Sequence, residues 1–190
     1  MKFPQILVTM ILVSAISPAA TITYSAVLSG ANESPAVITA GTGFTTVTYD
    51  SILHSLTVDV TFSNLTGLTT ASHIHCCIAV GGNAGVATTT PTFAGFPLNV
   101  TSGTYHNVLD LTMASSWNPA FITSSGGTTA LAEAVFGAGF AAGQSYLNVH
   151  SSFATSGEIR ALLVPEPATW SLVGAAFLIL ATVKKRPFRS

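Results

Sequence analysis

The chain has 190 residues, of which 48% are hydrophobic and only 7% are charged. A typical soluble domain carries about 25% charged residues, so the surface of this protein must be built largely from uncharged polar side chains. Between residues 21 and 164 a single base, Arg160, stands against six acids. This excess of negative charge argues against nucleic-acid binding, which needs Lys and Arg to neutralise phosphates.

The first twenty residues predict an export signal. Lys2 precedes an apolar run from Ile6 to Ile16, and the small residues of segment 17–20 follow. A short positive region, an apolar core and a small-residue cleavage site are the parts of a secretory signal peptide. We therefore expect residues 1–20 to be removed and the mature protein to be exported. The alternative is a buried N-terminal helix.

Residues 21–164 predict one all-β domain. In segment 53–62 apolar and polar residues alternate, which is the period of a half-buried strand. Other strands are expected at 22–29, 43–49, 71–77, 104–112, 145–150 and 158–164, and a helix at 130–142. Short strands separated by turn residues favour an antiparallel β-sandwich with one short helix. The last two strands should form a hairpin.

Three histidines are candidate metal ligands. His73 and His75 lie two residues apart, so on a strand they share one face. If the last hairpin lies nearby, His150 would join them, with Glu158, Arg160 and Cys77 close by. Three imidazoles on a rigid sheet suit Zn or Cu. The alternatives are a hydrogen-bonded histidine network that ties the strands together, and a role in proton transfer or ligand binding.

Two further pairs leave their roles open. Glu158 and Arg160 also share a strand face, so we expect a polar-face ion pair, with an anion-binding Arg160 as the alternative. Cys76 and Cys77 are adjacent, and adjacent cysteines rarely bridge because the geometry is strained. We expect structural thiols. One cysteine facing the histidines and an intermolecular disulfide are the other interpretations.

The C-terminal segment, 165–190, predicts a sorting or anchor signal. Pro165-Glu166-Pro167 is followed by an apolar stretch, 170–183, and then by the basic cluster Lys184, Lys185, Arg186 and Arg189. The stretch is short for a membrane helix, which needs about 20 residues, but thinning of the bilayer and snorkelling lysines would let it span. The basic cluster would stay cytoplasmic.

This C-terminal arrangement resembles the PEP-CTERM sorting signal of Gram-negative bacteria in motif, apolar segment, basic tail and position. The resemblance implies recognition by an exosortase-type processing enzyme and cleavage near the motif. It also implies an inner-membrane-anchored precursor that is then released toward the cell surface or an extracellular matrix such as a biofilm. The alternative is a plain membrane anchor.

The domain itself resembles the CHRD domain, which was first described in chordin and is widespread in bacterial secreted proteins. The matching segments are 24–35, 41–43, the Ala-Ser-His-Ile-His of 71–75, the Tyr-Leu-Asn-Val-His of 146–150, and 157–160. The family usually has Gly and Pro after the second His, where this chain has Cys76 and Cys77. The His-x-His pair also resembles the copper-ligand pair of Cu/Zn superoxide dismutase. The expected fold is therefore an immunoglobulin-like or superoxide-dismutase-like sandwich.

The sequence carries no nucleophile elbow, Walker loop or dinucleotide fingerprint. We therefore expect an exported, non-enzymatic cell-surface or matrix-associated protein, without excluding a metal-dependent redox activity. Extracellular polysaccharide is an expected partner, because hydroxyl groups and exposed aromatics such as Tyr105 and Trp117 can stack on sugars. The alternatives are a Cu- or Zn-binding protein that uses the histidine cluster, and a protein-interaction module.

Overall fold

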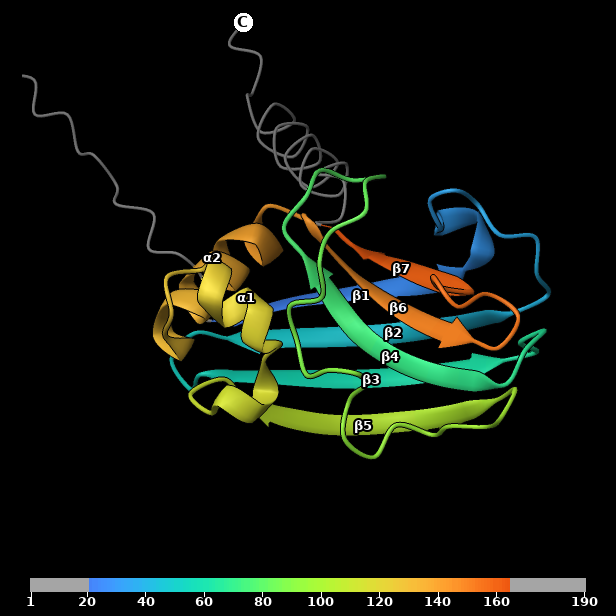
Figure 1. Cartoon of the computed structure of the whole chain (residues 1–190), viewed down its shortest axis with the longest axis horizontal. Coiled ribbons are helices and arrows are strands. Elements are labelled where there is room, and N and C mark those ends of the chain that lie inside the picture. The colour runs from blue at the N-terminus through green and yellow to red at the C-terminus, as the bar shows by residue number, and fades with distance from the viewer. Residues whose placement is uncertain (1–20, 165–190) are drawn as a thin grey trace, which may run out of the picture.

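The computed structural model describes residues 21–164 (Figure 1). The signal peptide expected at 1–20 and the sorting segment expected at 165–190 lie outside the described residues. Within residues 21–164, no helix is long and apolar enough to cross a membrane.

Within the described part of the chain, seven strands form one antiparallel sheet in the order β4-β6-β7-β1-β2-β3-β5. They are β1 (Thr21–Ser29), β2 (Thr42–Asp50), β3 (Ser55–Ser63), β4 (Thr69–Cys76), β5 (Gly103–Asp110), β6 (Ser145–Ser151) and β7 (Ile159–Leu163). The expected all-β antiparallel fold and the closing β6–β7 hairpin are therefore confirmed.

The sheet is bent where β1 meets β7. These two strands share one register pair, Ser29 with Arg160, whereas β1 pairs with β2 along its whole length. The short contact lets β4 and β6 lie across β2 in Figure 1. The fold is thus sandwich-like, a half-barrel formed by one continuous sheet rather than by two separate sheets.

The hydrophobic core lies between the two halves of the bent sheet. The alternation expected in β3 is confirmed, because Leu56, Val58, Val60 and Phe62 are all buried. From the other half, Ile74 of β4 and Leu147 and Val149 of β6 join the same core. Burial of this apolar area is the main force that holds the bend, since it contributes about 25 cal/mol per Å².

Two helices stand together at one end of the half-barrel (Figure 1). The longer helix, α2 (Thr129–Ala141), matches the helix that the sequence predicts, whereas the short α1 (Pro119–Ser124) was not expected. Each helix is preceded by an N-cap residue whose side chain accepts a hydrogen bond from the first turn. Asn118 accepts from the Ala120 N–H, and Thr128 accepts from the Leu131 N–H. There are also two single-turn 3-10 helices. The first, η1 (Gly30–Asn32), follows β1, and the second, η2 (Ala114–Ser116), precedes α1.

Candidate metal centre

The three histidines lie on the outer face of the β4-β6-β7 half, away from the hydrophobic core. In the strand register, His73 is opposite Asn148 and His75 is opposite Tyr146, while His150 is opposite Ala71. Their neighbours Ile74, Leu147 and Val149 point the other way, into the core. The two-residue alternation of these strands therefore separates an apolar inner face from a polar outer face.

Although it is outside the core, this outer face is buried. His73 is 7% exposed and His75 is 9% exposed, and all but one of the residues of β6 are buried. Two loops cover the face, one of them within residues 33–37 and the other within residues 82–91. They are joined by a hydrogen bond from the Asn83 amide to the Ser34 carbonyl, 2.7 Å long.

Each ring is held through Nδ1 by a backbone carbonyl. The partner is Pro91 for His73 at 3.0 Å, Ala84 for His75 at 2.8 Å and Thr155 for His150 at 2.9 Å. A carbonyl oxygen can only accept, so each Nδ1 carries the proton. In a neutral imidazole, Nε2 is then left with a free lone pair. A carbonyl that accepts from Nδ1 in this way fixes both the tautomer and the orientation of a ligating histidine.

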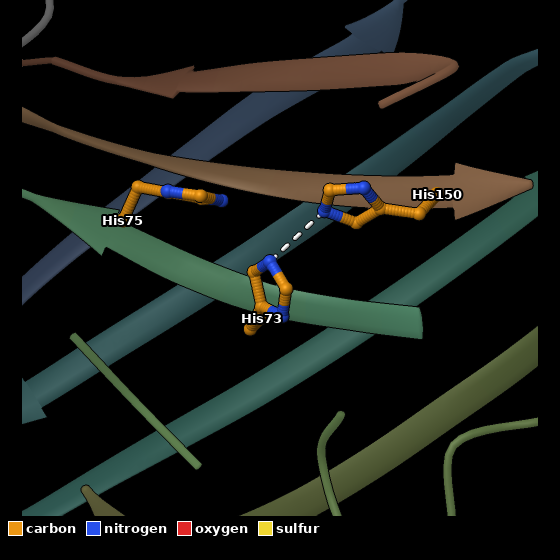
Figure 2. Close-up of side chains that lie close together, drawn as sticks. All are labelled: His73, His75 and His150. Atoms are coloured by element: carbon orange, nitrogen blue, oxygen red, sulfur yellow. Dashed lines mark hydrogen bonds between the residues drawn. The ribbon is translucent and has the colours of Figure 1, made fainter. Parts of the chain in front are cut away.

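The three Nε2 atoms face one another (Figure 2). Nε2 of His73 lies 2.9 Å from Nε2 of His150, and one ligand atom from each of the three rings lies within 4.8 Å of the others. The buried Nε2 of His75 has no hydrogen-bond partner among the described residues. In a tetrahedral site with metal–nitrogen bonds of about 2.1 Å, the ligand nitrogens lie about 3.4 Å apart. The observed separations, from 2.9 Å to at most 4.8 Å, lie on both sides of that spacing, so small shifts of the rings would bring all three nitrogens onto one ion.

Burial keeps the rings neutral. It lowers the pKa of His73 to about 3, with a further contribution from the neighbouring His150 and His75. It also lowers the pKa of His75 to about 4 and lowers that of His150. Two neutral rings that both present Nε2 lone pairs cannot hydrogen-bond to each other, so the 2.9 Å contact is favourable only with a cation between the two nitrogens. A bound metal ion would supply that charge, and so would a proton shared by the two rings.

Arg160 pairs with Glu33 and not with Glu158, which corrects the expected ion pair. Its guanidinium lies 3.0 Å from the Glu33 carboxylate, and each of these two side chains is 3% exposed. The same guanidinium lies 3.9 Å above the Tyr146 ring and donates to the Asn83 side chain at 2.7 Å. The ion pair therefore ties loop 33–37 and loop 82–91 to the outer face of the sheet.

Glu158 is buried in a different place, so it does not join the histidines. Its carboxylate accepts hydrogen bonds from the Thr66 and Gly67 N–H groups and from the Ser151 and Thr39 hydroxyls. Burial acts against the charged form, but these hydrogen bonds prevail and lower the pKa of Glu158. This residue holds the turn after β3 against β6 and is a structural anion.

The two cysteines form a disulfide with each other, where thiols were expected. Strand β4 ends at Cys76, whose side chain belongs to the core side, so Cys77 does not continue the histidine face. Cys77 lies against α2, with its Sγ 3.7 Å from the Val135 carbonyl. The aromatic residues expected to be exposed are also placed differently, because Tyr105 and Trp117 are both buried.

Sequence reasoning missed Glu33 and Tyr146 as members of this site. The Tyr146 ring stacks on His75 with ring centroids 4.6 Å apart. Its position opposite His75 follows from strand alternation once the pairing of β4 with β6 is known. Glu33 lies in a loop that is distant in sequence from the histidines, and no local sequence pattern identifies it as a member of the site. The remaining histidines lie outside the cluster, His54 beside Glu133 and His106 beside Asp59.

Beside the cluster lies a pocket of about 300 Å³, lined by His75, Tyr146, the Glu33–Arg160 pair and both covering loops. Fold and site together define an antiparallel half-barrel domain with a buried histidine cluster on its outer face. The CHRD domain family matches residues 24–163. The chain therefore belongs to the CHRD family, as the sequence resemblance implied, and membership of this family indicates a secreted or extracellular domain protein. No curated protein and no solved structure matches the chain.

Proposed function

We propose that the protein is an exported metal-binding protein whose CHRD domain holds one Cu or Zn ion on His73, His75 and His150. The carrying observation is that three Nε2 lone pairs converge while every Nδ1 donates to a carbonyl. An all-imidazole set suits Zn and Cu better than Mg or Ca, which prefer oxygen ligands. Three protein ligands leave a further coordination position.

The rigidity of the site supports this proposal over a purely structural network. All three histidines are on paired strands. The carbonyls that orient His73 and His75 come from loop 82–91, which Arg160 ties down through Asn83, and the carbonyl that orients His150 comes from the turn between β6 and β7. The cluster is thus held with few adjustable torsions, which favours binding because little ordering entropy is lost. The proposal is one of binding and assigns no catalytic step.

The test is the metal content of the full chain, exported to a periplasm and purified without a His tag. Wild type should carry about one Cu or Zn ion per chain, and His73→Ala, His75→Ala and His150→Ala should each lose it. His106→Ala is the matched control, since this exposed histidine lies outside the cluster and should leave the metal content unchanged. Metal-free wild type after loading with both ions would refute the proposal.

We also propose that the export and sorting segments deliver this metal site to the cell surface or matrix. The proposal rests on the order of motif, apolar segment and basic cluster in residues 165–190. Deletion of this segment should abolish surface localisation while the periplasmic protein keeps its metal. Unchanged localisation would refute the sorting role and leave the metal proposal standing.

A further inference from the structure

A second reactive group lies at the junction between the metal-ligand strand and the loop that covers it. Cys76 is the last residue of β4 and follows His75 directly, and its disulfide to Cys77 closes the strand end. The chain then runs through residues 78–86, which include Ala84, the carbonyl partner of His75. The disulfide is therefore the starting point of the segment that orients one ligand.

One side of the disulfide is sealed by α2. A Cβ atom added to Gly139 would lie 2.5 Å from Sγ of Cys77 and 2.6 Å from Sγ of Cys76. Only a glycine lets both sulfurs rest this closely on the helix backbone. The sulfurs are thus fitted against the helix, and breaking their bond would force them apart in a space that α2 already fills.

The other side opens to a pocket of about 380 Å³. Cys76 lines this pocket together with residues 85–86 and the short helix α1. Cys76 is only 5% exposed whereas Cys77 is half-buried, so attack on the Sγ of Cys76 would have to come through the pocket. A mostly apolar wall, including Val86 and Phe121, suits a small uncharged reductant.

The segment after the disulfide is tied back to β4. The Cys76 N–H donates to the Gly85 carbonyl at 3.3 Å, and His75 forms an isolated bridge with Val86. On its outer side, Asn83 binds Arg160. A shift of the chain at Cys77 would therefore be passed on to the Ala84 carbonyl and to the ring of His75.

We propose that the Cys76–Cys77 disulfide is a thiol-exchange site for a small dithiol, and that its reduction weakens metal binding through segment 78–86. The second half of this inference rests on the proposed metal site. In the first step, a thiolate of the dithiol attacks Sγ of Cys76, the bond between the two cysteines breaks, and Cys77 leaves and takes up a proton. In the second step, the other thiol of the reductant closes its own disulfide and releases Cys76 as a thiol. Two electrons and two hydrogens pass from the dithiol to the protein.

The consequence for the site follows from packing. Two thiols must separate to van der Waals distance, and α2 blocks one direction. The strand end and segment 78–86 therefore have to move, which releases the His75 ring from its fixed orientation. Loss of a hydrogen bond that orients a ligating histidine typically costs 10- to 100-fold in metal affinity.

The experiment uses the full chain with dithiothreitol as the dithiol, which is removed anaerobically before each measurement. Free thiols are counted without denaturant, and Zn affinity is then titrated in the oxidised and reduced protein. Two thiols per chain should appear, and the Zn affinity should fall at least about tenfold, with recovery on reoxidation. The variant Cys76→Ser/Cys77→Ser should have the Zn affinity of the reduced protein, and dithiothreitol should not change it. Because this variant has no thiols, it also tests whether the new thiols of the reduced protein bind zinc themselves.

Each failure has a distinct signature. Thiols that appear only in denaturant would overturn the exchange site, and thiols that appear with unchanged affinity would overturn the coupling. If the oxidised protein binds neither Zn nor Cu, the proposed function fails. In that case amide hydrogen exchange of residues 78–86 still decides the inference: faster exchange on reduction supports it, and unchanged exchange overturns it.

Discussion

The buried Glu33–Arg160 pair gives the most quantitative prediction. Arg160 is the single base of residues 21–164 and is 2% exposed, and Glu33 is 7% exposed. The substitution Arg160→Met keeps an unbranched apolar stem but removes the guanidinium, which leaves the Glu33 carboxylate buried without its cation. Removal of one partner of a buried pair typically costs about 3–5 kcal/mol.

The free energy of protonating Glu33 limits how large this loss of stability can be. Burial already raises the pKa of Glu33, and Arg160 acts against that rise. Without the arginine, the folded variant would take up a proton, which costs about 1.4 kcal/mol per pH unit above the ordinary pKa of 4.5. At pH 7 this amounts to about 3.4 kcal/mol. Since the folded pKa is raised, the stability is retained below pH 4.5 and is lost as the pH rises.

Urea denaturation at pH 7 and pH 5 is the assay. Relative to wild type, Arg160→Met should lose about 3–4 kcal/mol at pH 7, and the loss should shrink by about 2.7 kcal/mol at pH 5. The double variant Glu33→Gln/Arg160→Met should recover about 2 kcal/mol at pH 7 and show little pH dependence. An equal loss at both pH values, or a double variant no better than the single, would refute the reasoning.

Three further predictions concern the cluster, the helix contact and the anion. Burial lowers the pKa of His73 to about 3 and that of His75 to about 4, so protons should compete with the metal only at low pH. The metal content measured after dialysis should therefore be unchanged at pH 5.5 and should fall to zero near pH 4. Loss of half the metal near pH 6.5 would contradict this. Gly139→Ala should lower the free energy of unfolding by about 1–3 kcal/mol, because the added Cβ would overlap both sulfurs of the disulfide. Thermal unfolding measures this loss. The control is Ala138→Ser at the exposed neighbouring position, which should leave the stability nearly unchanged. Glu158→Gln should cost about 2–3 kcal/mol at pH 7 in urea. Since hydrogen bonds lower the pKa of Glu158, its stabilising effect is lost as the pH falls through the folded pKa, so the cost should shrink steadily below pH 4.5; a constant cost would contradict this.

Strand periodicity explains what the sequence could predict. The two-residue alternation places Leu56 and Val58 in the core, and it places His73 and His75 on one face. The same rule, had it been applied to β5, would have turned Tyr105 inward together with Leu109. Information of this kind is local, because each strand carries its own pattern of inner and outer residues.

Contacts made by loops could not be predicted in this way. Glu158 precedes β7, so its side chain is not governed by the alternation that orients Arg160. The partner that Arg160 finds, Glu33, comes from a loop that is brought close only when the sheet bends. The Cys76–Cys77 disulfide likewise depends on where β4 ends and on the bare backbone at Gly139.

The contact between the Nε2 atoms of His73 and His150 allows an experiment to distinguish a metal site from a hydrogen-bonded histidine network. In His150→Asn the amide nitrogen can take the place of Nδ1 and donate to the Thr155 carbonyl, so only Nε2 is removed. In metal-free protein this change should alter the free energy of unfolding by less than about 1 kcal/mol, because the lost contact joined two acceptors. A network would lose about 1–3 kcal/mol.

With Zn present the same variant should lose the stabilisation that binding gives wild type, which at 100 times Kd is about 2.7 kcal/mol. Urea denaturation with EDTA and with Zn measures both cases. A large loss in EDTA with no added loss in Zn would show that the histidines tie the strands together by sharing a proton and that they do not bind Zn.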